Sequence, residues 1–440
     1  MSPVQRILAF LLTTVVVLPA APLTRHFDFG ATATANDWLP VNADTFYSSS
    51  RGYGFESGAV ITSTNPTTAA APRDNFCTSE KPFFFSVALP EGNYRVTLTL
   101  GDRAGESHTT VKAESRRLIV PAVDTKRGEI ITTTFIVNVR NAHLPDGAQV
   151  KLKPREIGAW HWDDRLTLEF NGARPCVAAL EITTANDAIT VFLAGDSTVT
   201  DQQLEPWSAW GQMLPAFFDD TVAVANHAES GETIKSFVGE RRLEKIMSLI
   251  KPGDALFIQF GHNDQKQNAE HTDAATGYKD FLRRYISETK AKGAFPVLVT
   301  SMERRNFDAN GHIKPSLEGY PQAMREVGLE LAVPVLDLNA MSIPLYEALG
   351  PEGTKNAFVY FPANSFPNQP LALSDDTHFS SYGADQLARC LVEAIKAQLP
   401  SLAKHLRPGL PVYDPSHPMP FAARHLSASP SKPVVKPEGS

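Results

Sequence analysis

Two short polar segments in the second half of the chain contain residue types that can perform nucleophilic catalysis. The first, residues 195–198, ends an apolar run and places Ser197 where its hydroxyl can be exposed at the end of a strand. The second, residues 375–378, places His378 three residues after Asp375, so that the carboxylate can orient the imidazole as a general base for a serine. Taken alone, a Gly-Asp-Ser turn or an Asp helix cap beside a surface histidine is the commoner origin of each pattern.

Further groups could stabilise the oxyanion that forms when a serine attacks an ester carbonyl. Asn263, in residues 261–264, has a side-chain amide that can donate to an oxyanion. Gly231, which ends residues 226–231, would let its backbone N–H approach a substrate closely. A helix starting after Ser197 would add free N–H groups and a favourable field. Each segment could be only a turn, because Gly, Asn and Asp favour loops, but their co-occurrence points to a serine hydrolase.

The elements that must position these residues alternate between strands and helices from residue 187 to 405. Apolar runs predict strands at 189–194, 222–225, 255–260, 296–300 and 333–336. Helical spacing of apolar residues predicts one helix containing residues 278–286 and ending near Gly293, and a closing helix over 387–399. This alternation indicates an α/β domain with a doubly wound, parallel five-stranded sheet, in which ligands bind beyond the carboxyl ends of the strands. The candidate segments follow strands or precede the closing helix.

Residues 25–186 have a different pattern, without a convincing helical period. Their β-branched and aromatic runs, several with period two, predict strands at 83–89, 94–100, 133–139 and 166–170. Turn residues at 90–93 and 171–172 separate such runs. We therefore expect an antiparallel β-sandwich of roughly 160 residues. Trp160 and Trp162 could stack on sugar rings, or they could pack in the core or at a domain interface.

The two ends of the chain differ in composition from the domains. Residues 1–21 combine Arg6, an apolar run and small residues, which predicts a secretory signal peptide and a secreted or periplasmic protein. The apolar run is too short for a membrane anchor. Residues 406–440 are rich in Pro and Ser and lack periodicity, which predicts a loose tail.

The composition limits the class of protein. A chain of 440 residues favours two domains, and the net charge of -7 has no electrostatic footprint for nucleic acid. The only cysteines, Cys77, Cys176 and Cys390, lack the spacing of a zinc site or a disulfide scaffold. Cys77 and Cys176 could pair in an oxidising compartment, or all three could be small buried apolar residues.

Together, the polar segments resemble the conserved blocks of the SGNH (GDSL-type) hydrolases, in their order. Those blocks are Gly195-Asp196-Ser197, Gly231, residues 261–264 and Asp375-x-x-His378. This resemblance implies a flavodoxin-like form of the parallel five-stranded sheet. Longer segments, spread over about residues 188–400, resemble the rhamnogalacturonan acetylesterase family: 190–199, 259–264, 320–327, 334–338 and 376–384. The N-terminal region resembles the galactose-binding-like β-sandwich of bacterial members at 27–30, 51–56 and 168–172.

This resemblance implies a role for each matching residue. Ser197 would be the nucleophile, His378 its base and Asp375 the residue that orients the histidine, with Asp376 as the competing orienter. The oxyanion hole would consist of the Ser197 and Gly231 backbone N–H groups and the Asn263 side chain. Asp196 and Asp264 would stabilise the loops, and His262 has no assigned role. The family needs no metal or cofactor, and none is expected here.

The resemblance also implies an ester hydrolase that acts on an acetylated pectic polysaccharide or oligosaccharide, rhamnogalacturonan in particular. Arg304 and Arg305, after the fourth strand, could bind uronate carboxylates or be solvated surface charges. An acetylxylan esterase or a lipase-like esterase could use the same site, and a non-catalytic carbohydrate-binding protein is the alternative from another class. Neither nucleic acid nor, once the leader is removed, a membrane is an expected partner.

Overall fold

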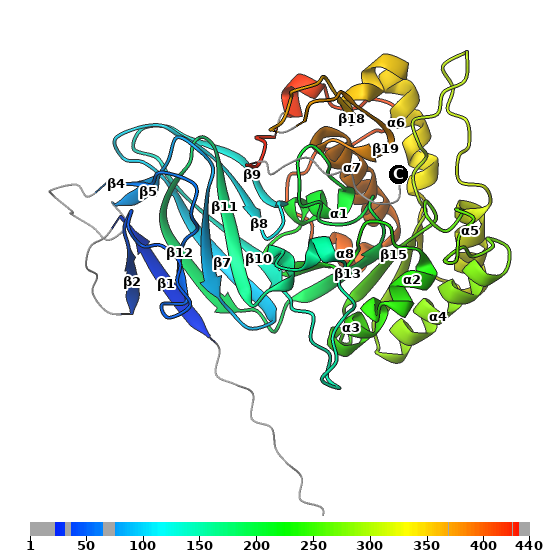
Figure 1. The fold of residues 1–440 in the computed structure, drawn as a ribbon, viewed down its shortest axis with the longest axis horizontal. Helices are drawn as coiled ribbons and strands as arrows, with labels where there is room; N and C mark the ends of the chain where they lie inside the picture. Colours follow the sequence, from blue (N-terminus) through cyan, green and yellow to red (C-terminus); the bar gives the residue numbers. More distant parts are fainter. Residues whose placement is uncertain (1–22, 31–36, 65–74, 368, 425, 431–440) are drawn as a thin grey trace, which may run out of the picture.

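The computed structural model describes residues 23–30, 37–64, 75–367, 369–424 and 426–430. Two domains lie side by side, an N-terminal β-sandwich on the left of Figure 1 and a C-terminal α/β domain on the right. The predicted leader, residues 1–21, lies outside the described residues, so export stays a prediction.

The N-terminal domain consists of two packed sheets. One has the order β10-β7-β12-β1-β2, and β5 with β4 extends it beside β12. Its strands are β1 (Thr24–Phe29), β2 (Trp38–Val41), β4 (Thr62–Thr64), β5 (Phe76–Thr78), β7 (Gly92–Gly101), β10 (Ile130–Val139) and β12 (Cys176–Thr184). The other sheet has the order β3-β6-β11-β8-β9. Its strands are β3 (Tyr53–Phe55), β6 (Phe83–Ala88), β8 (Ser107–Ala113), β9 (Arg117–Thr125) and β11 (Arg165–Arg174).

The sandwich core follows from the period-two pattern of these strands. Phe83, Phe85 and Val87 of β6 are buried, and they belong to the same cluster as Phe27 and Phe29 of the opposite sheet. The Phe85 ring lies 4.9 Å from the Phe29 ring, centroid to centroid. Alternate side chains of both sheets therefore form one apolar layer, which confirms the predicted β-sandwich.

The turn predicted at residues 171–172 is wrong. Both residues lie inside strand β11, where the pairing with β8 shifts register at a bulge between Asn171 and Arg174. Gly172 has a φ of +124°, and a Cβ at this position would lie 2.2 Å from the carbonyl oxygen of His108. The glycine therefore permits a bulge and a close approach of two strands rather than a chain reversal.

The α/β domain is built on a parallel sheet with the order β14-β13-β15-β16-β17. Its strands are β13 (Ile189–Gly195), β14 (Val222–Asn226), β15 (Ala255–Gln259), β16 (Phe295–Val299) and β17 (Val335–Leu336). This order is flavodoxin-like and confirms the predicted fold class. Because β13 lies between β14 and β15, the loops that follow these three strands meet at one edge of the sheet.

Helices cover both faces of this sheet, because the strands direct alternate apolar side chains to each side. Val191 and Leu193 pack with α1, α6 and α7, whereas Phe192 and Ala194 pack with α2 to α5. The helices are α1 (Trp210–Met213), α2 (Ile234–Gly239), α3 (Arg242–Leu249), α4 (Gly277–Ala291), α5 (Tyr320–Leu331), α6 (Leu338–Gly353), α7 (Ser381–Gln398) and α8 (Pro400–Ala403). The two helices predicted from apolar spacing correspond to α4 and α7. Short 3-10 turns are η1 (Pro154–Glu156), η2 (Trp160–Trp162), η3 (Leu214–Phe217), η4 (Thr354–Asn356) and η5 (Phe421–Arg424).

An antiparallel hairpin that the sequence patterns did not indicate precedes α7. It consists of β18 (Phe358–Phe361) and β19 (Leu373–Phe379). Neighbouring side chains of a strand point to opposite faces. Asp375 on β19 is therefore buried, whereas the side chain of Asp376 is exposed.

The β8–β9 hairpin of the sandwich joins the two domains. Arg117, the first residue of β9 after the hairpin turn, is buried, and its Nε donates to the Asp201 carboxylate at 2.9 Å. Arg116 pairs with Glu205 at 2.6 Å, and Leu118 packs into the core of the α/β domain. The sandwich therefore contributes both charge and apolar surface to the segment that follows β13.

The loose tail expected from residue 406 is wrong for the described part of that segment. The Met419 carbonyl accepts a hydrogen bond from the Tyr382 hydroxyl at 2.6 Å, on α7. Further along, the Ser429 hydroxyl donates to Glu169 of the sandwich at 2.8 Å. The segment crosses from one domain to the other because buried polar groups on both surfaces take partners from it.

The cysteines and tryptophans agree with the interpretation that their side chains pack within the protein. All three cysteines are free and buried, and burial raises the pKa of the Cys77 thiol to about 12. Trp162 is buried at the domain junction, where its indole N–H donates to Glu156 at 2.8 Å. The Trp160 ring packs 4.6 Å from the Phe84 ring.

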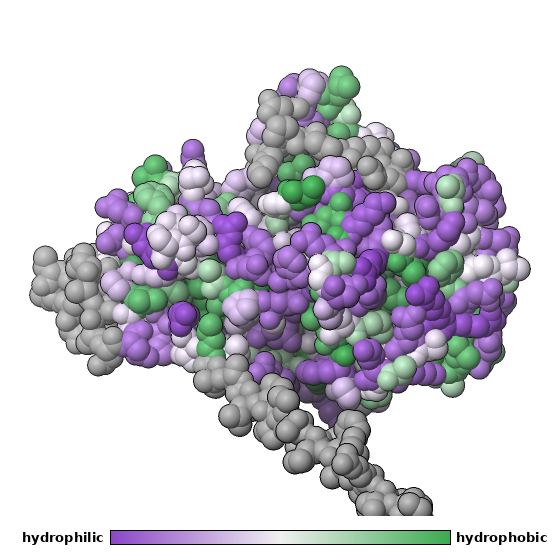
Figure 2. Space-filling model, turned by 60° about the horizontal axis from the view of Figure 1, so that its bottom comes forward, coloured by the Kyte–Doolittle hydropathy of each residue, from purple (hydrophilic) through white to green (hydrophobic). Residues whose placement is uncertain are grey.

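The surface is mostly polar on the face seen in Figure 2, where hydrophobic residues are scattered among hydrophilic ones. Within the described ranges, no helix has the length and apolar character needed to cross a bilayer.

Arg117→Met should lower the free energy of unfolding by about 3–5 kcal/mol, because it leaves the Asp201 carboxylate buried without its cation. Arg284→Met is the matched control, since it removes an exposed pair with Glu288 on α4 and should cost less than about 0.5 kcal/mol. Guanidinium unfolding followed by tryptophan fluorescence measures both changes. Equal losses in the two variants would show that the domain junction does not depend on this pair.

Candidate active site

Ser197 lies in a tight turn directly after β13. The Asp196 carboxylate accepts hydrogen bonds from the Thr198 backbone N–H at 2.9 Å and from its hydroxyl at 2.7 Å, which closes the turn. At Gly195, a Cβ would lie 2.6 Å from Cγ2 of Val199 and 2.9 Å from the Gln259 carbonyl oxygen. The small residue and the carboxylate therefore set the path of the backbone at Ser197.

The helix expected to start after Ser197 is absent. Residues 197–199 form a turn, and the next helix, α1, begins at Trp210. Three successive β-branched residues, Thr198, Val199 and Thr200, disfavour a helix because their side chains crowd the preceding turn. The expected helix dipole therefore makes no contribution to this site.

His378 and Asp375 lie on β19, with the His378 side chain directed at Ser197 and the Asp375 side chain directed at His378. His378 Nε2 is 2.8 Å from the Ser197 hydroxyl oxygen, and His378 Nδ1 is 2.9 Å from Asp375 Oδ2. All three residues are buried. The side chain of Asp376 instead pairs with Arg305 at 3.1 Å, on the opposite face of the strand. The geometry favours Asp375 over Asp376 as the residue that orients His378.

The charge of Asp375 is stabilised by its surroundings. Burial opposes ionisation, but the hydrogen bond and charge of His378 outweigh it, and backbone N–H groups of Thr377 and His378 add to them. The pKa of Asp375 therefore lies well below its ordinary value. A carboxylate of this kind contributes stability above its unfolded-state pKa and loses it as the pH falls through the folded-state pKa. At neutral pH it is ionised and can stabilise an imidazolium.

The donors predicted for an oxyanion lie on the loops of the three neighbouring strands. Ser197 follows β13, Gly231 follows β14 and Asn263 follows β15. In the described part of the chain, the backbone N–H groups of Ser197 and Gly231 have no protein acceptor. Asn263 Nδ2 donates to the Glu232 carbonyl at 2.9 Å, which orients the amide and leaves its second N–H for another acceptor. The arrangement supplies donors of the right kind, and their role stays a prediction.

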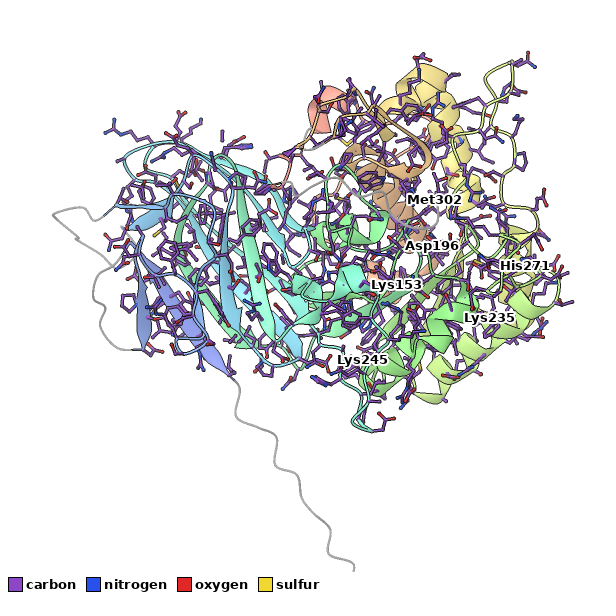
Figure 3. The ribbon with its side chains drawn as sticks, viewed as in Figure 1. Lys153, Asp196, Lys235, Lys245, His271 and Met302 are labelled. Atoms are coloured by element: carbon purple, nitrogen blue, oxygen red, sulfur yellow. The ribbon has the colours of Figure 1, made fainter. Side chains whose placement is uncertain are left out.

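Buried residues next to this site stabilise its loops. Asp196, labelled in Figure 3, lies 3.6 Å from His262 Nδ1 through its second oxygen. Burial lowers the pKa of His262, although the hydrogen bond and charge of Asp196 oppose this effect. Asp264 accepts from the Ile234 backbone N–H at 2.9 Å, at the start of α2. Burial raises the pKa of Asp264 to about 7. Asp196 and Asp264 thus have the loop contacts expected of them.

Comparison with known proteins identifies both domains. Residues 193–386 match the GDSL-like lipase/acylhydrolase family. A rhamnogalacturonan acetylesterase of Bacillus subtilis (strain 168) is 46% identical over 220 residues, which are 50% of this chain and 94% of that protein. The chain belongs to the GDSL-like lipase/acylhydrolase family. It is therefore a carboxylic ester hydrolase.

The N-terminal domain of this GDSL-like hydrolase has its own relatives. Residues 25–143 match the galactose-binding-like domain of β-agarase and YxiM-type esterases. The B. subtilis esterase YxiM is 30% identical over 395 residues, which are 87% of this chain and 93% of that protein. A solved structure of YxiM covers 85% of this chain and 98% of its own, with 27% identity and a TM-score of 0.45.

Arg304 and Arg305 of this GDSL-like hydrolase are both bound to protein groups. Arg304 donates to the Thr377 hydroxyl and to the His262 carbonyl, each at 3.2 Å, and so connects two loops of the site. Arg305 pairs with Asp376 and is less closely connected to the catalytic residues than Arg304 is. Their predicted role as ligands for uronate stays a prediction.

Sequence reasoning missed the amides that support the nucleophile turn. Gln202 Nε2 donates to the Ser197 carbonyl and Gln259 Nε2 to the Thr198 hydroxyl, each at 2.7 Å. Gln259 is a polar residue in an otherwise apolar strand, and this signal could have identified it. Gln202 lies in a loop without a pattern, so nothing in the sequence indicated its contact.

Asp375→Asn in this GDSL-like hydrolase should lower kcat for p-nitrophenyl acetate by about 10³–10⁴-fold, because an amide cannot stabilise the imidazolium and favours the wrong tautomer. Asp376→Asn, one residue away on the exposed face, is the matched control and should leave kcat nearly unchanged. Steady-state kinetics of both purified variants measure the difference. A larger loss from Asp376→Asn would assign the orienting role to that residue.

Proposed function

We propose that this hydrolase is a serine esterase that removes O-acetyl groups from a plant cell-wall polysaccharide, specifically rhamnogalacturonan. The observation that carries this proposal is the continuous hydrogen-bond chain from Asp375 through His378 to Ser197, with distances of 2.9 and 2.8 Å. The substrate class is supported by the name of the B. subtilis relative that is 46% identical. A plant cell-wall polysaccharide lies outside the cell, so the proposal implies an exported enzyme, in agreement with the predicted leader.

The acetyl group is first transferred to the enzyme. His378 Nε2 accepts the proton of the Ser197 hydroxyl as Oγ attacks the acetyl carbonyl carbon. The oxyanion that forms accepts hydrogen bonds from the Ser197 and Gly231 N–H groups and the Asn263 amide. The C–O bond to the sugar then breaks, and the sugar oxygen takes the proton from His378. Acetyl-Ser197 and a free sugar hydroxyl are the products of this half-reaction.

Water completes the cycle by the same route. His378 accepts a proton from the water as its oxygen attacks acetyl-Ser197, and a second oxyanion forms at the same position. The bond to Ser197 Oγ breaks, Oγ recovers its proton from His378, and acetic acid leaves and ionises to acetate in solution. Asp375 stays ionised throughout and compensates the charge on the imidazolium.

Ser197→Ala should abolish acetate release, with a loss of about 10⁶-fold in kcat, because no acyl-enzyme can form. Ser287→Ala, an exposed serine on α4, is the matched control and should behave as wild type. Acetate is measured by an enzyme-coupled assay on acetylated rhamnogalacturonan and acetylated xylan. Hydrolysis of p-nitrophenyl acetate and octanoate is followed in parallel.

Each result of this comparison has a definite meaning. Preferential release from rhamnogalacturonan and acetate esters, lost only in Ser197→Ala, supports the proposal. Preference for xylan or for octanoate keeps the mechanism and changes the substrate to those of an acetylxylan esterase or a lipase-like enzyme. Polysaccharide binding without any turnover would contradict the proposed esterase activity and favour a non-catalytic carbohydrate-binding protein.

A further inference from the structure

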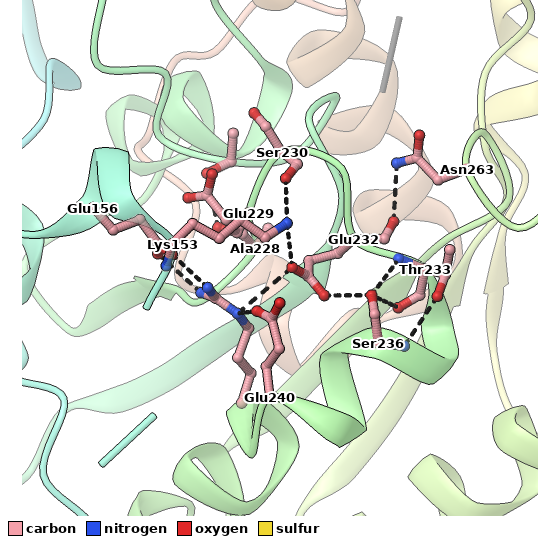
Figure 4. A network of polar contacts seen from close by, with 12 residues as sticks. Lys153, Glu156, Ala228, Glu229, Ser230, Glu232, Thr233, Ser236, Glu240 and Asn263 are labelled. Atoms are coloured by element: carbon pink, nitrogen blue, oxygen red, sulfur yellow. Dashed lines mark hydrogen bonds and ion pairs between the residues drawn. The ribbon is translucent and has the colours of Figure 1, made fainter. Parts of the chain in front are cut away.

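Two cations from the β-sandwich bind one carbonyl oxygen beside the catalytic serine. Lys153 Nζ donates to the Ser230 carbonyl at 2.7 Å, and an Arg155 Nη donates to the same oxygen at 2.6 Å. Both residues lie at η1, in the loop between β10 and β11 of the N-terminal domain, whereas Ser230 follows β14 of the catalytic domain. Figure 3 marks Lys153 between the two domains, and Figure 4 shows its bonds.

The loop that carries these cations is firmly attached to the catalytic domain. Glu156, directly after Arg155, is fully buried and bound by Arg242 of α3 at 2.5 Å. The Glu156 carboxylate also accepts from the Lys153 backbone N–H at 2.8 Å. Lys153 therefore lies in a short segment that one local hydrogen bond closes and one ion pair attaches to the catalytic domain.

Each cation also has a buried carboxylate partner next to Ser230. Lys153 pairs with Glu232 at 2.5 Å, and Arg155 Nε donates to Glu229 at 2.8 Å. The two carboxylates offset the charge of the cations beside the site. The remaining effect of the cations acts through their direct bonds to the Ser230 carbonyl.

The bonds to Ser230 matter because its carbonyl and the Gly231 N–H belong to one peptide unit. Resonance couples the two ends of that unit. Cations on the oxygen withdraw electron density from the nitrogen, and hydrogen bonds in series polarise one another. The Gly231 N–H becomes a stronger donor, and its direction is held by the bonds on the opposite end of the peptide. A donor of this kind gains most when an oxyanion is present, that is, in the transition state.

We propose that Lys153 and Arg155 are positioning residues of the oxyanion hole, supplied by the β-sandwich domain, which hold and polarise the Ser230–Gly231 peptide. This inference rests on the proposed function, because it assigns the Gly231 N–H to an oxyanion. It gives the N-terminal domain a part in the chemistry of the ester, in addition to any contact with sugar.

Lys153→Met and Arg155→Met in the full-length chain should each lower kcat for p-nitrophenyl acetate by about tenfold. The estimate lies below the loss of about 10²–10³-fold for removing an oxyanion donor outright, because here the donor is only weakened. KM should stay within about twofold, since the ground-state carbonyl gains little from the donor. The Ki of 1,1,1-trifluoroacetone, which forms a tetrahedral adduct with an active serine, should rise by the same factor as kcat falls.

Further variants separate polarisation from simple structural loss. Lys151→Met removes an exposed lysine of the same loop and should behave as wild type. Lys153→Arg retains the charge and should restore most of kcat, whereas Lys153→Gln retains a donor without the charge and should not. In Lys153→Met/Glu232→Gln the carboxylate that has lost its lysine partner is neutralised, so kcat should stay low if the loss comes from the Ser230 carbonyl.

The outcomes distinguish this inference from the proposed function. An unchanged kcat in Lys153→Met and Arg155→Met, recovery in the double variant, or a kcat loss without a change in Ki each overturns the role of the two cations. If a methionine variant does not fold, the Lys153→Gln and Lys153→Arg pair decides by the same criteria. A wild-type protein without esterase activity, or an active Ser197→Ala, would instead overturn the proposed function.

Discussion

The buried ion pair between Arg117 and Asp201 is the contact on which the arrangement of the site depends. Asp201 lies in the loop that follows Ser197, and its second oxygen accepts from Asn226 at the end of β14. One carboxylate thus connects the sandwich hairpin, the nucleophile loop and a neighbouring strand of the catalytic sheet. A buried charge of this kind is costly unless its partners are in place, so the packing of the sandwich against the catalytic domain stabilises the conformation of this loop.

This dependence explains how two domains share one active site. Half of this chain matches nearly the full length of the B. subtilis rhamnogalacturonan acetylesterase, whereas the match to YxiM extends over both domains. The GDSL-like fold therefore supports a complete enzyme in a shorter protein, and the sandwich is not a general requirement for the chemistry. In the two-domain chain, however, the sandwich contributes Arg117 below the nucleophile loop and Lys153 beside the Gly231 loop. These two loops of the catalytic domain are therefore stabilised in part across the domain junction.

The features that the sequence could predict are those encoded within a few residues. The positions of the five parallel strands and the loops of Ser197, Gly231 and Asn263 follow from short apolar runs, each ended by polar residues, whereas the flavodoxin-like strand order follows from the resemblance to the SGNH hydrolases. The features it could not predict arise from distant contacts. Nothing near Lys153 indicates a bond to a carbonyl 77 residues away, and Asn171 and Gly172 form a bulge rather than a turn because β8 lies against them. The contacts of residues 406–430 could not be predicted for the same reason, since their partners lie on surfaces that exist only after folding.

The ion-pair network beside the site also lowers the stability of the fold, because it contains more carboxylates than cations. Its members are Lys153, Arg155, Arg242, Glu156, Glu229, Glu232 and Glu240. Burial, and after it the charge of Glu156, raises the pKa of Glu229 to about 7, and burial together with the charge of Glu232 does the same for Glu240. A carboxyl group whose folded-state pKa is raised binds a proton that the unfolded chain has already released, so its contribution to stability falls as the pH rises from about 4.5 to 7. Ionisation of Glu229 in the same range completes its pair with the arginine that binds Ser230. Burial thus opposes the charge on Glu229 that its pair with Arg155 requires, and such a conflict is expected where a fold retains buried charge.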